Sequence, residues 1–315
     1  MLLAVHYSQP PDWRWYILGY FFVAGLAGGA YTLGTLLRLW GRPADEQAAR
    51  LCFLVTLPLV VICPLPLIAD LGSPLRFWHM MIDTGVTGPG LIFKDWSPMS
   101  LGVWALLVFG ALATITFLEV VALDGRYRYP ASRFVGWLLG GALGRLVNVV
   151  GTLFALFVAG YTGVLLSVSN QPVWSDTYAL GGLFLISGMG GAAAMIAVLT
   201  PWRPAAAASH EALADADAYF SLLELAFIAV LFVTLAIAGQ FARSVGSPYW
   251  ILLWLVAILS LVPPLLTRIR GGRVTVGGGG AAVMSRVGIS ATATALIVLV
   301  GVVALRAAVI WSAQG

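Results

Sequence analysis

Eight stretches of apolar residues recur along this chain, and each is long enough to cross a membrane. An α-helix rises about 1.5 Å per residue, so about 20 apolar residues span the roughly 30 Å hydrocarbon layer of a bilayer. The stretches cover residues 15–39, 51–70, 98–123, 134–169, 177–200, 218–241, 248–268 and 287–311. The fourth is too long for one span, so its first two turns are expected at or beyond the membrane interface. The pattern predicts an all-α integral membrane protein with about eight transmembrane helices, arranged as two four-helix bundles.

The composition excludes a soluble domain. Of the 315 residues, 60% are hydrophobic and 10% are charged, whereas about a quarter of the residues in soluble domains are charged. The net charge of +4 comes almost entirely from arginine, since Lys94 is the only lysine. These arginines flank the apolar segments, so they indicate topology rather than a nucleic-acid partner. We therefore expect one polytopic membrane domain over residues 1–315, with the lipid bilayer as its surroundings.

The distribution of basic residues predicts how the chain is oriented. Eleven of the 17 lysines and arginines lie in the first, third, fifth and seventh connections, and four lie on the opposite side. The positive-inside rule then places the odd connections in the cytoplasm and both termini on the outer, periplasmic side of a bacterial or archaeal inner membrane. The first apolar run has a polar, aromatic lead-in, so no cleavable signal peptide is expected.

Three connecting segments have recognisable compositions. Residues 71–97 form a long outer connection rich in Gly, Pro, aromatic and charged residues, and a loop of this length is usually functional. Residues 271–282 include the run Gly277–Gly280 and are expected to form a flexible cytoplasmic linker. Residues 204–217 are Ala-rich and acidic, which suggests a short surface helix.

Ligands for a resident redox centre are missing from the sequence. A transmembrane haem b needs two histidines that face each other inside the bilayer, but His6, His79 and His210 lie in expected tails or loops. The two cysteines, Cys52 and Cys63, share one apolar segment and are interpreted as small buried hydrophobic residues. We therefore expect no haem, iron–sulfur cluster or metal in this chain, so electron chemistry requires a diffusible cofactor and a partner.

Four polar residues are expected on the outer side, in or beside the apolar spans: Asp70, Arg76, His79 and Tyr161. Such groups are costly near lipid and often mark functional sites. Each also has a structural interpretation. Asp70 can cap the following turn with Arg76 as its ion-pair partner, His79 can be an interface residue, and Tyr161 can pack between helices.

Three more ionisable residues are expected in the inner half of the bundle, at one depth: Glu119, Arg145 and Glu224. Together they suggest a polar route for protons between the cytoplasm and the outer layer. The structural alternative is an ion pair between Glu119 and Arg145, with Glu224 bonded to a neighbouring hydroxyl group. Arg306, near the outer end of the last span, is expected to extend towards the lipid headgroups.

Four sequence blocks resemble the NrfD/polysulfide-reductase family of membrane subunits. They are YFFVAGLAGGAYT (20–32), IADLGSPLRFW (68–78), WSPMSLGVW (96–104) and YTGVLLSVSNQPVW (161–174), and with residues 184–192 they cover the first five spans. The resemblance implies a membrane anchor that exchanges electrons with a diffusible quinone, menaquinone or ubiquinone. It also implies a ferredoxin-like iron–sulfur subunit and a molybdopterin or multihaem catalytic subunit as partners, and no prosthetic group in this chain.

The resemblance also implies a quinone headgroup site among the first four helices, near the side where the iron–sulfur subunit docks. Some family members place His or Asn on the first helix, but this chain has Phe21–Ala24 there. The quinone-binding residues are therefore expected to be Asp70, Arg76, His79 and Tyr161. The partner-docking residues are expected to be Trp78, Lys94 and Trp96.

Two alternative functions remain open on the sequence alone. Glycine-rich helices in an eight-span protein also occur in secondary transporters, although residues 15–123 and 177–268 show no convincing inverted repeat. The protein can also be a structural anchor without an active quinone site, because the first helix departs from the family pattern.

Overall fold

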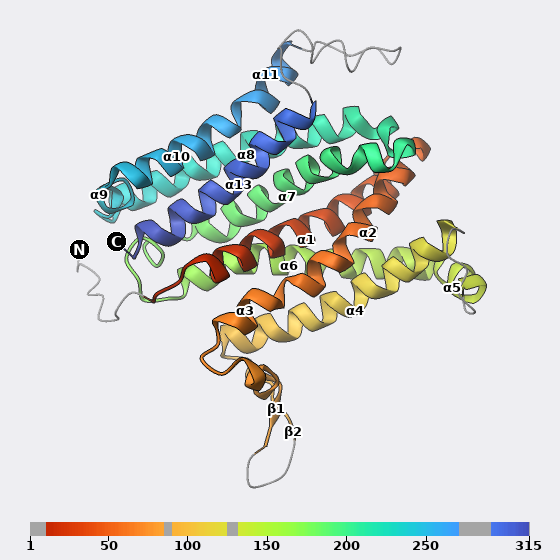
Figure 1. The fold of residues 1–315 in the computed structure, drawn as a ribbon, viewed down its shortest axis with the longest axis horizontal. Coiled ribbons are helices and arrows are strands. Elements are labelled where there is room, and N and C mark those ends of the chain that lie inside the picture. The colour runs from red at the N-terminus through yellow and green to blue at the C-terminus, as the bar shows by residue number, and fades with distance from the viewer. Residues whose placement is uncertain (1–10, 85–89, 125–131, 271–290, 315) are drawn as a thin grey trace.

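The computed structural model describes residues 11–84, 90–124, 132–270 and 291–314 (Figure 1). Within these ranges, eight helical segments are long and apolar enough to cross a membrane. They are Trp15–Trp40, Pro43–Asp70, Pro98–Asp124, Ala142–Ser167, Ala179–Trp202, Pro204–Ile237, Pro248–Arg268 and Ala291–Ser312. The prediction of an all-α membrane protein with about eight spans is confirmed.

The helices of the first four spans are α1 (Trp15–Trp40), α2 (Glu46–Ile62), α3 (Pro64–Asp70), α4 (Pro98–Asp124), α5 (Ser132–Leu139) and α6 (Ala142–Ser167). Those of the last four are α7 (Ala179–Leu199), α8 (His210–Ile237), α9 (Phe241–Ser244), α10 (Pro248–Ser260), α11 (Val262–Arg270) and α13 (Ala291–Ser312). Short 3₁₀ segments are η1 (Pro43–Asp45), η2 (Pro74–Met80), η3 (Thr200–Trp202) and η4 (Pro204–Ser209). Two-residue strands β1 (Ile82–Asp83) and β2 (Gly90–Leu91) pair antiparallel.

Proline explains two of the breaks inside the spans. The second span divides into α2 and α3 at Cys63, directly before Pro64, and the seventh divides into α10 and α11 at Leu261, before Pro263 and Pro264. Proline has no amide hydrogen and its ring clashes with the preceding helical turn, so a continuous helix is interrupted there. The long fourth stretch divides into α5 and α6 at Gly140 and Gly141, which agrees with the expectation that its first turns stand apart.

One segment differs from its expected form. Residues 204–217 do not make a separate surface helix, because η4 leads directly into α8, which continues without a break from His210 to Ile237. His210, expected in a loop, is the first residue of that helix. The expected linker 271–282 and His6 lie outside the described residues.

Helix α1 occupies the centre of the packing. It lies against α2, α6 and α7, while α4 packs on α2 and α6 (Figure 1). Glycines permit the close approach: a Cβ atom on Gly28 would collide with the carbonyl of Ala155 on α6, and one on Gly29 would collide with the carbonyl of Gly188 on α7. The glycines of α1 therefore allow α6 and α7 to pack closely against it.

The second half is built around α7, which packs on α8 and α13, and α13 also packs on α10. Because α1 and α6 both contact α7, the two halves of the chain are in extensive contact. The division into two four-helix bundles stays a prediction. Hydrogen bonds between Trp13 and Gln314, at 2.8 and 2.9 Å, hold the two ends of the described chain together. Which face of the membrane they occupy also stays a prediction.

Candidate functional site

The segment between α3 and α4 projects away from the transmembrane helices (Figure 1). It begins after Asp70, where the backbone turns extended at Leu71, and it contains η2 and the β1–β2 pair. The indole nitrogen of Trp104 on α4 donates a hydrogen bond to the Ile92 carbonyl at 2.8 Å, which ties the returning chain to the bundle. Residues 85–89 of this segment lie outside the described part. We refer to residues 71–97 as the projecting segment.

Three of the four expected quinone-binding residues lie at this end and are exposed. Asp70 is the last residue of α3, and Arg76 and His79 belong to η2. The His79 ring stacks on Trp78 with a centroid separation of 3.8 Å. Within the described residues, the structure has no ion pair between Asp70 and Arg76. The structural interpretation in which these two charges neutralise each other is therefore wrong.

Tyr161 lies inside the helix packing instead. Its hydroxyl group donates a hydrogen bond of 2.5 Å to the carbonyl of Pro98, the first residue of α4. Its ring lies against Gly102, where any side chain would collide with it. The ring also stacks on that of Phe157, with 5.5 Å between the ring centroids. Tyr161 therefore joins α6 to the start of α4, directly behind the projecting segment.

Sequence reasoning missed Tyr20, although this residue opens the first block of the family resemblance. Tyr20 is buried on α1, and its hydroxyl lies near Tyr161 and Cys63. The described part of the chain provides no hydrogen-bond partner for that hydroxyl. Residues 21–24, where the family pattern places a polar group, are apolar in this chain, and the polar group stands one residue earlier.

The expected docking residues lie on the projecting segment. Lys94 and Trp96 are exposed, with 77% of the Trp96 surface accessible, and Trp78 is half-buried. Several further large apolar side chains on the segment are exposed: Leu75, Phe77, Met80, Leu91 and Phe93. The segment therefore combines exposed apolar groups with positive charges that have no acidic partner in the described chain.

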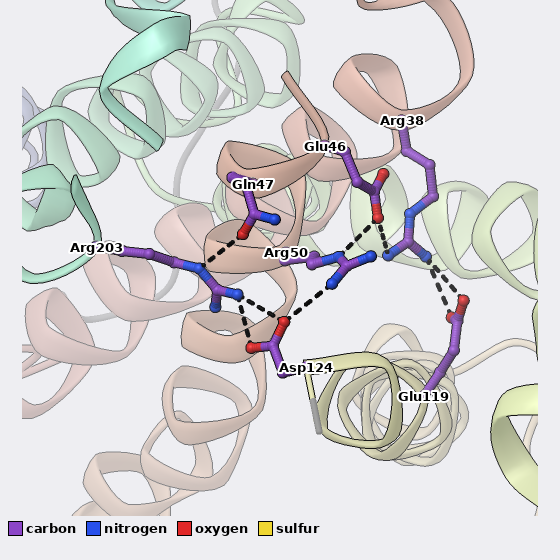
Figure 2. Close-up of polar contacts among 7 residues, drawn as sticks. All are labelled: Arg38, Glu46, Gln47, Arg50, Glu119, Asp124 and Arg203. Carbon is purple, nitrogen blue, oxygen red and sulfur yellow. Dashed lines mark hydrogen bonds and ion pairs between the residues drawn. The ribbon is translucent and has the colours of Figure 1, made fainter. Parts of the chain in front are cut away.

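A second group of charges lies at the end of the bundle where α1 finishes, and we call it the ionic network (Figure 2). It consists of Arg38, Glu46, Gln47, Arg50, Glu119, Asp124 and Arg203. Its three arginines and three carboxylates alternate along one series of contacts and join α1, α2, α4 and the residue after η3. Every charge in it has a partner.

The contacts within the ionic network are short. Arg38 lies 3.1 Å from Glu119 and 3.3 Å from Glu46. Arg50 lies 2.9 Å from Glu46 and 3.0 Å from Asp124, so it joins these two carboxylates. On the other side of Asp124, Arg203 contacts both carboxylate oxygens at 2.6 Å. Sequence reasoning used Arg38, Arg50 and Arg203 only as topology signals, and nothing in their spacing indicated which acids they would meet.

The ionic network corrects the expected ion pair between Glu119 and Arg145. The Glu119 carboxylate is bound by Arg38 of α1, not by Arg145 of α6. Arg145 is exposed on α6, and the described residues include no ion-pair partner for it. The helical phase explains the difference, because Arg145 lies on the outward face of α6 whereas Asn148 and Gly151 lie on the buried face.

Arg306 is also placed differently from expectation, since it is fully buried rather than extended towards the headgroups. Its guanidinium donates to the Phe21 carbonyl at 3.2 Å, to the Phe184 carbonyl at 3.1 Å and to the Ser187 hydroxyl at 3.1 Å. Ser187 also interacts with Glu224 of α8. That Glu224 bonds a neighbouring hydroxyl group stays a prediction, although Ser187 lies close to it.

Glu119 and Glu224 therefore belong to separate sites. Glu119 contacts Arg38, whereas Glu224 lies beside Arg306, which contacts Phe21. Phe21 and Arg38 are seventeen residues apart on the continuous helix α1, a distance of about 25 Å along its axis. The expected single polar patch at one depth is wrong, although the role of each residue in proton movement stays a prediction. Among the described residues, no group of three or more His, Cys, Asp or Glu side chains could hold a metal ion.

Comparison with known proteins identifies the family. The family described as "Polysulphide reductase, NrfD" matches residues 5–314. Protein NrfD of Escherichia coli (strain K12) is 28% identical over 325 aligned residues, which cover 96% of this chain and 95% of the relative. The C subunit of polysulfide reductase from Wolinella succinogenes is 28% identical over 186 residues, which cover 56% of this chain and 54% of the relative. The chain belongs to the NrfD/polysulphide reductase family, the cytoplasmic-membrane, multi-pass subunits of respiratory oxidoreductases.

Proposed function

We propose that this chain exchanges electrons between the membrane quinone pool and a partner subunit that carries iron–sulfur clusters or haems. The observation that carries the proposal is the arrangement at one end of the first four helices. Tyr20, Tyr161 and the break at Cys63 meet inside the bundle, and the projecting segment follows directly from the same helices. A quinone in the membrane and a soluble electron carrier would thus meet across a short distance.

The side chains at this end suit quinone chemistry. Oxidation of a quinol releases two protons with two electrons, so the site needs groups that accept protons and a donor that holds a carbonyl oxygen. Asp70 and His79 are the proton acceptors, and Arg76 supplies positive charge. The Tyr20 hydroxyl, which has no partner in the described chain, is the hydrogen-bond donor that takes the place of the family's polar residue on the first helix. Tyr161 positions α4 and the entry to the projecting segment.

The projecting segment is the proposed docking surface. Partner interfaces are typically centred on exposed aromatic groups within a polar rim, and Trp78, Lys94 and Trp96 fit that pattern. The partners we propose are a ferredoxin-like iron–sulfur subunit and, beyond it, a molybdopterin or multihaem catalytic subunit. The relative from Wolinella succinogenes supports an assembly of this kind by its name, as one subunit of a larger reductase.

The test is quinol oxidation by the complex purified from its own membrane, with quinol supplied in nanodiscs. Tyr20→Phe removes one hydrogen bond, worth about 1 kcal/mol, and should raise the apparent quinol KM about fivefold while the complex stays intact. Tyr178→Phe is the matched control, because Tyr178 is 98% exposed and lies outside α1, α4 and α6. Equal KM values for the two variants would exclude Tyr20 as the donor. A complex with no quinol oxidation at all would indicate a structural anchor.

Proton movement coupled to quinol oxidation is part of the proposal, with Glu119, Arg145 and Glu224 as its candidate residues. Because these residues lie in different sites, a substitution at one of them tests only the site that contains it. Glu224→Gln in proteoliposomes should reduce coupled acidification without loss of assembly. Glu119→Gln should instead weaken the ionic network, because its charge is bound directly by Arg38.

A further inference from the structure

Two buried acids lie on one face of α8. Asp217, Ser221 and Glu224 are spaced four and three residues apart, so their side chains project in the same direction. Only 8% of Asp217 and 2% of Glu224 is exposed. One carboxylate oxygen of Asp217, Oδ1, is buried without a hydrogen-bond partner among the described residues. The two carboxyl groups are close enough to interact electrostatically.

Helices α7 and α13 form the opposite wall of this site. Ser187 of α7 interacts with Glu224 and accepts a hydrogen bond from Arg306 Nη1. The other donors of Arg306 reach the carbonyls of Phe21, Phe184 and Val302, so the guanidinium closes the site on the side away from Asp217. Glu224 and Arg306 also lie within electrostatic reach of each other.

Among the side chains that the structure describes, the charges in this site do not balance. Arg306 is one cation, while Asp217 and Glu224 are two acids. The helix α7 and the segment η4, which pack on α8, contain no charged residue. Helices α11 and α9, which also contact α8, contribute Arg268, which is exposed and lies 4.0 Å from Asp215, and the exposed Arg243. The last residue of α11 is Arg270, whose side chain lies outside the described part of the chain. The ionic network differs, because its three cations match three anions (Figure 2).

An unbalanced negative charge is costly where lipid and apolar side chains exclude water. The site therefore keeps one of its two carboxyl groups protonated, so that the remaining carboxylate matches Arg306. We propose that Asp217, Glu224 and Arg306, with Ser187 and Ser221, form a binding site for one exchangeable proton. The site lies outside the proposed quinone pocket, shares only Glu224 with the expected proton route and depends on no quinone chemistry.

The proton enters from the end where α8 begins. Asp217 lies two turns from that end, nearer to it than Glu224, and retains slight exposure. A proton from the aqueous phase reaches the Asp217 carboxylate as hydronium, which leaves neutral water behind. Asp217 then gives this proton to the Ser221 hydroxyl oxygen while Ser221 gives its own hydroxyl proton to the Glu224 carboxylate. By the positive-inside count this entrance faces the cytoplasm.

Infrared spectroscopy of the full-length chain in lipid nanodiscs tests the site, because a protonated carboxyl group has its own C=O stretching band, which shifts in D₂O. The wild-type protein should show one such buried group at neutral pH. Asp217→Asn and Glu224→Gln should each abolish the band, since a single remaining acid then matches Arg306 and ionises. Arg306→Gln should double the band, because neither acid then has a cation. Glu119→Gln is the matched control and should leave the band unchanged, since Glu119 is already paired with Arg38.

The proposal is overturned if the wild-type band is absent, or if it survives unchanged in either folded variant, Asp217→Asn or Glu224→Gln. Gel filtration and circular dichroism identify variants that do not fold. If Arg306→Gln is among them, Arg306→Lys retains the cation and should keep the band at its wild-type intensity. Ser221→Ala retains both acids, so the band should remain, but its shift in D₂O should appear several times more slowly. An unaltered rate would exclude the relay through Ser221.

Discussion

The two ends of the first four helices carry similar kinds of side chains but arrange them in opposite ways. At the end where α1 finishes, Arg38, Arg50 and Arg203 are each bound by a carboxylate (Figure 2). At the other end, Asp70 and Arg76 are exposed and do not pair with each other. The charges of the ionic network are used within the chain, whereas those near the projecting segment are available to another molecule.

This difference separates charges that are paired within the chain from the unpaired charges to which we assign a function. Sequence position alone does not distinguish the two groups of charges, since both lie beside apolar spans. Their partners distinguish them: a carboxylate held between two arginines stabilises the helix ends, while an exposed and unpaired charge contributes little to folding and stays available to another molecule. The comparison can be tested at each end in turn.

The largest effect is expected for Arg38→Leu. This change leaves the buried Glu119 carboxylate without a cation and removes one of two partners from Glu46. Breaking one side of a buried ion pair costs about 3–5 kcal/mol, so the melting temperature of the detergent-solubilised protein should fall steeply. The double variant Arg38→Leu with Glu119→Leu should recover most of the loss. A single variant as stable as the wild type would remove the distinction between the two ends.

The next effect is expected for Asp70→Asn, in activity rather than stability. Asparagine keeps the shape of the side chain but cannot take up a proton, so quinol-dependent turnover should fall at least about tenfold, equivalent to about 1.4 kcal/mol in the barrier. The melting temperature and subunit composition should match the wild type, since Asp70 is exposed. Turnover within about twofold of the wild type would leave Asp70 only the role of capping its turn.

A smaller effect is expected for Lys94→Glu, in partner association. Reversing an exposed charge near an interface mainly slows association, and we expect affinity for the electron-transfer subunit to fall several-fold, more at low salt than at high salt. Arg145→Glu is the matched control. Arg145 is also exposed and unpaired in the described chain, but it belongs to α6 and not to the projecting segment. If pull-down experiments show that Arg145→Glu weakens association and Lys94→Glu does not, the docking face is inverted.

The smallest effect is expected for Arg76→Gln, and it concerns the stability of the fold. Because Arg76 forms no ion pair with Asp70, its removal should leave the melting temperature unchanged within experimental scatter, unlike the loss of Arg38. Differential scanning fluorimetry of both variants in the same detergent makes the comparison directly. A fall in melting temperature as large as that of Arg38→Leu would mean that ionic contacts of Arg76 hold the projecting segment in place.

Much of the fold could be predicted because the bilayer imposes a single length and polarity on every span. The eight apolar stretches gave the spans, and the helix breaks appeared where proline or paired glycines stand. The starts of spans were less predictable. α2 begins at Glu46 and α8 at His210, both earlier than hydropathy suggests, because polar first turns extend beyond the hydrocarbon.

The pairing of charges could not be predicted, because it depends on helix rotation and on contacts between distant segments. Glu119 and Arg145 were expected to meet since they lie at similar counts from the membrane surface. The partner of Glu119 is 81 residues away on α1, and Arg145 lies on a different face of its helix. Tyr20 was missed for a related reason: only the structure shows that its hydroxyl faces α6 rather than lipid.

Arg306 gives the last helix a role in the biosynthesis of the protein. An arginine in the last third of this span makes membrane insertion of α13 less favourable, because a buried cation is costly unless it is hydrogen-bonded. The acceptors that offset this cost, Phe21, Phe184 and Ser187, belong to helices synthesised earlier. Insertion of α13 is therefore more favourable when α1 and α7 are already in place. Arg306 thus couples the placement of the last span to the correct placement of the first and fifth spans.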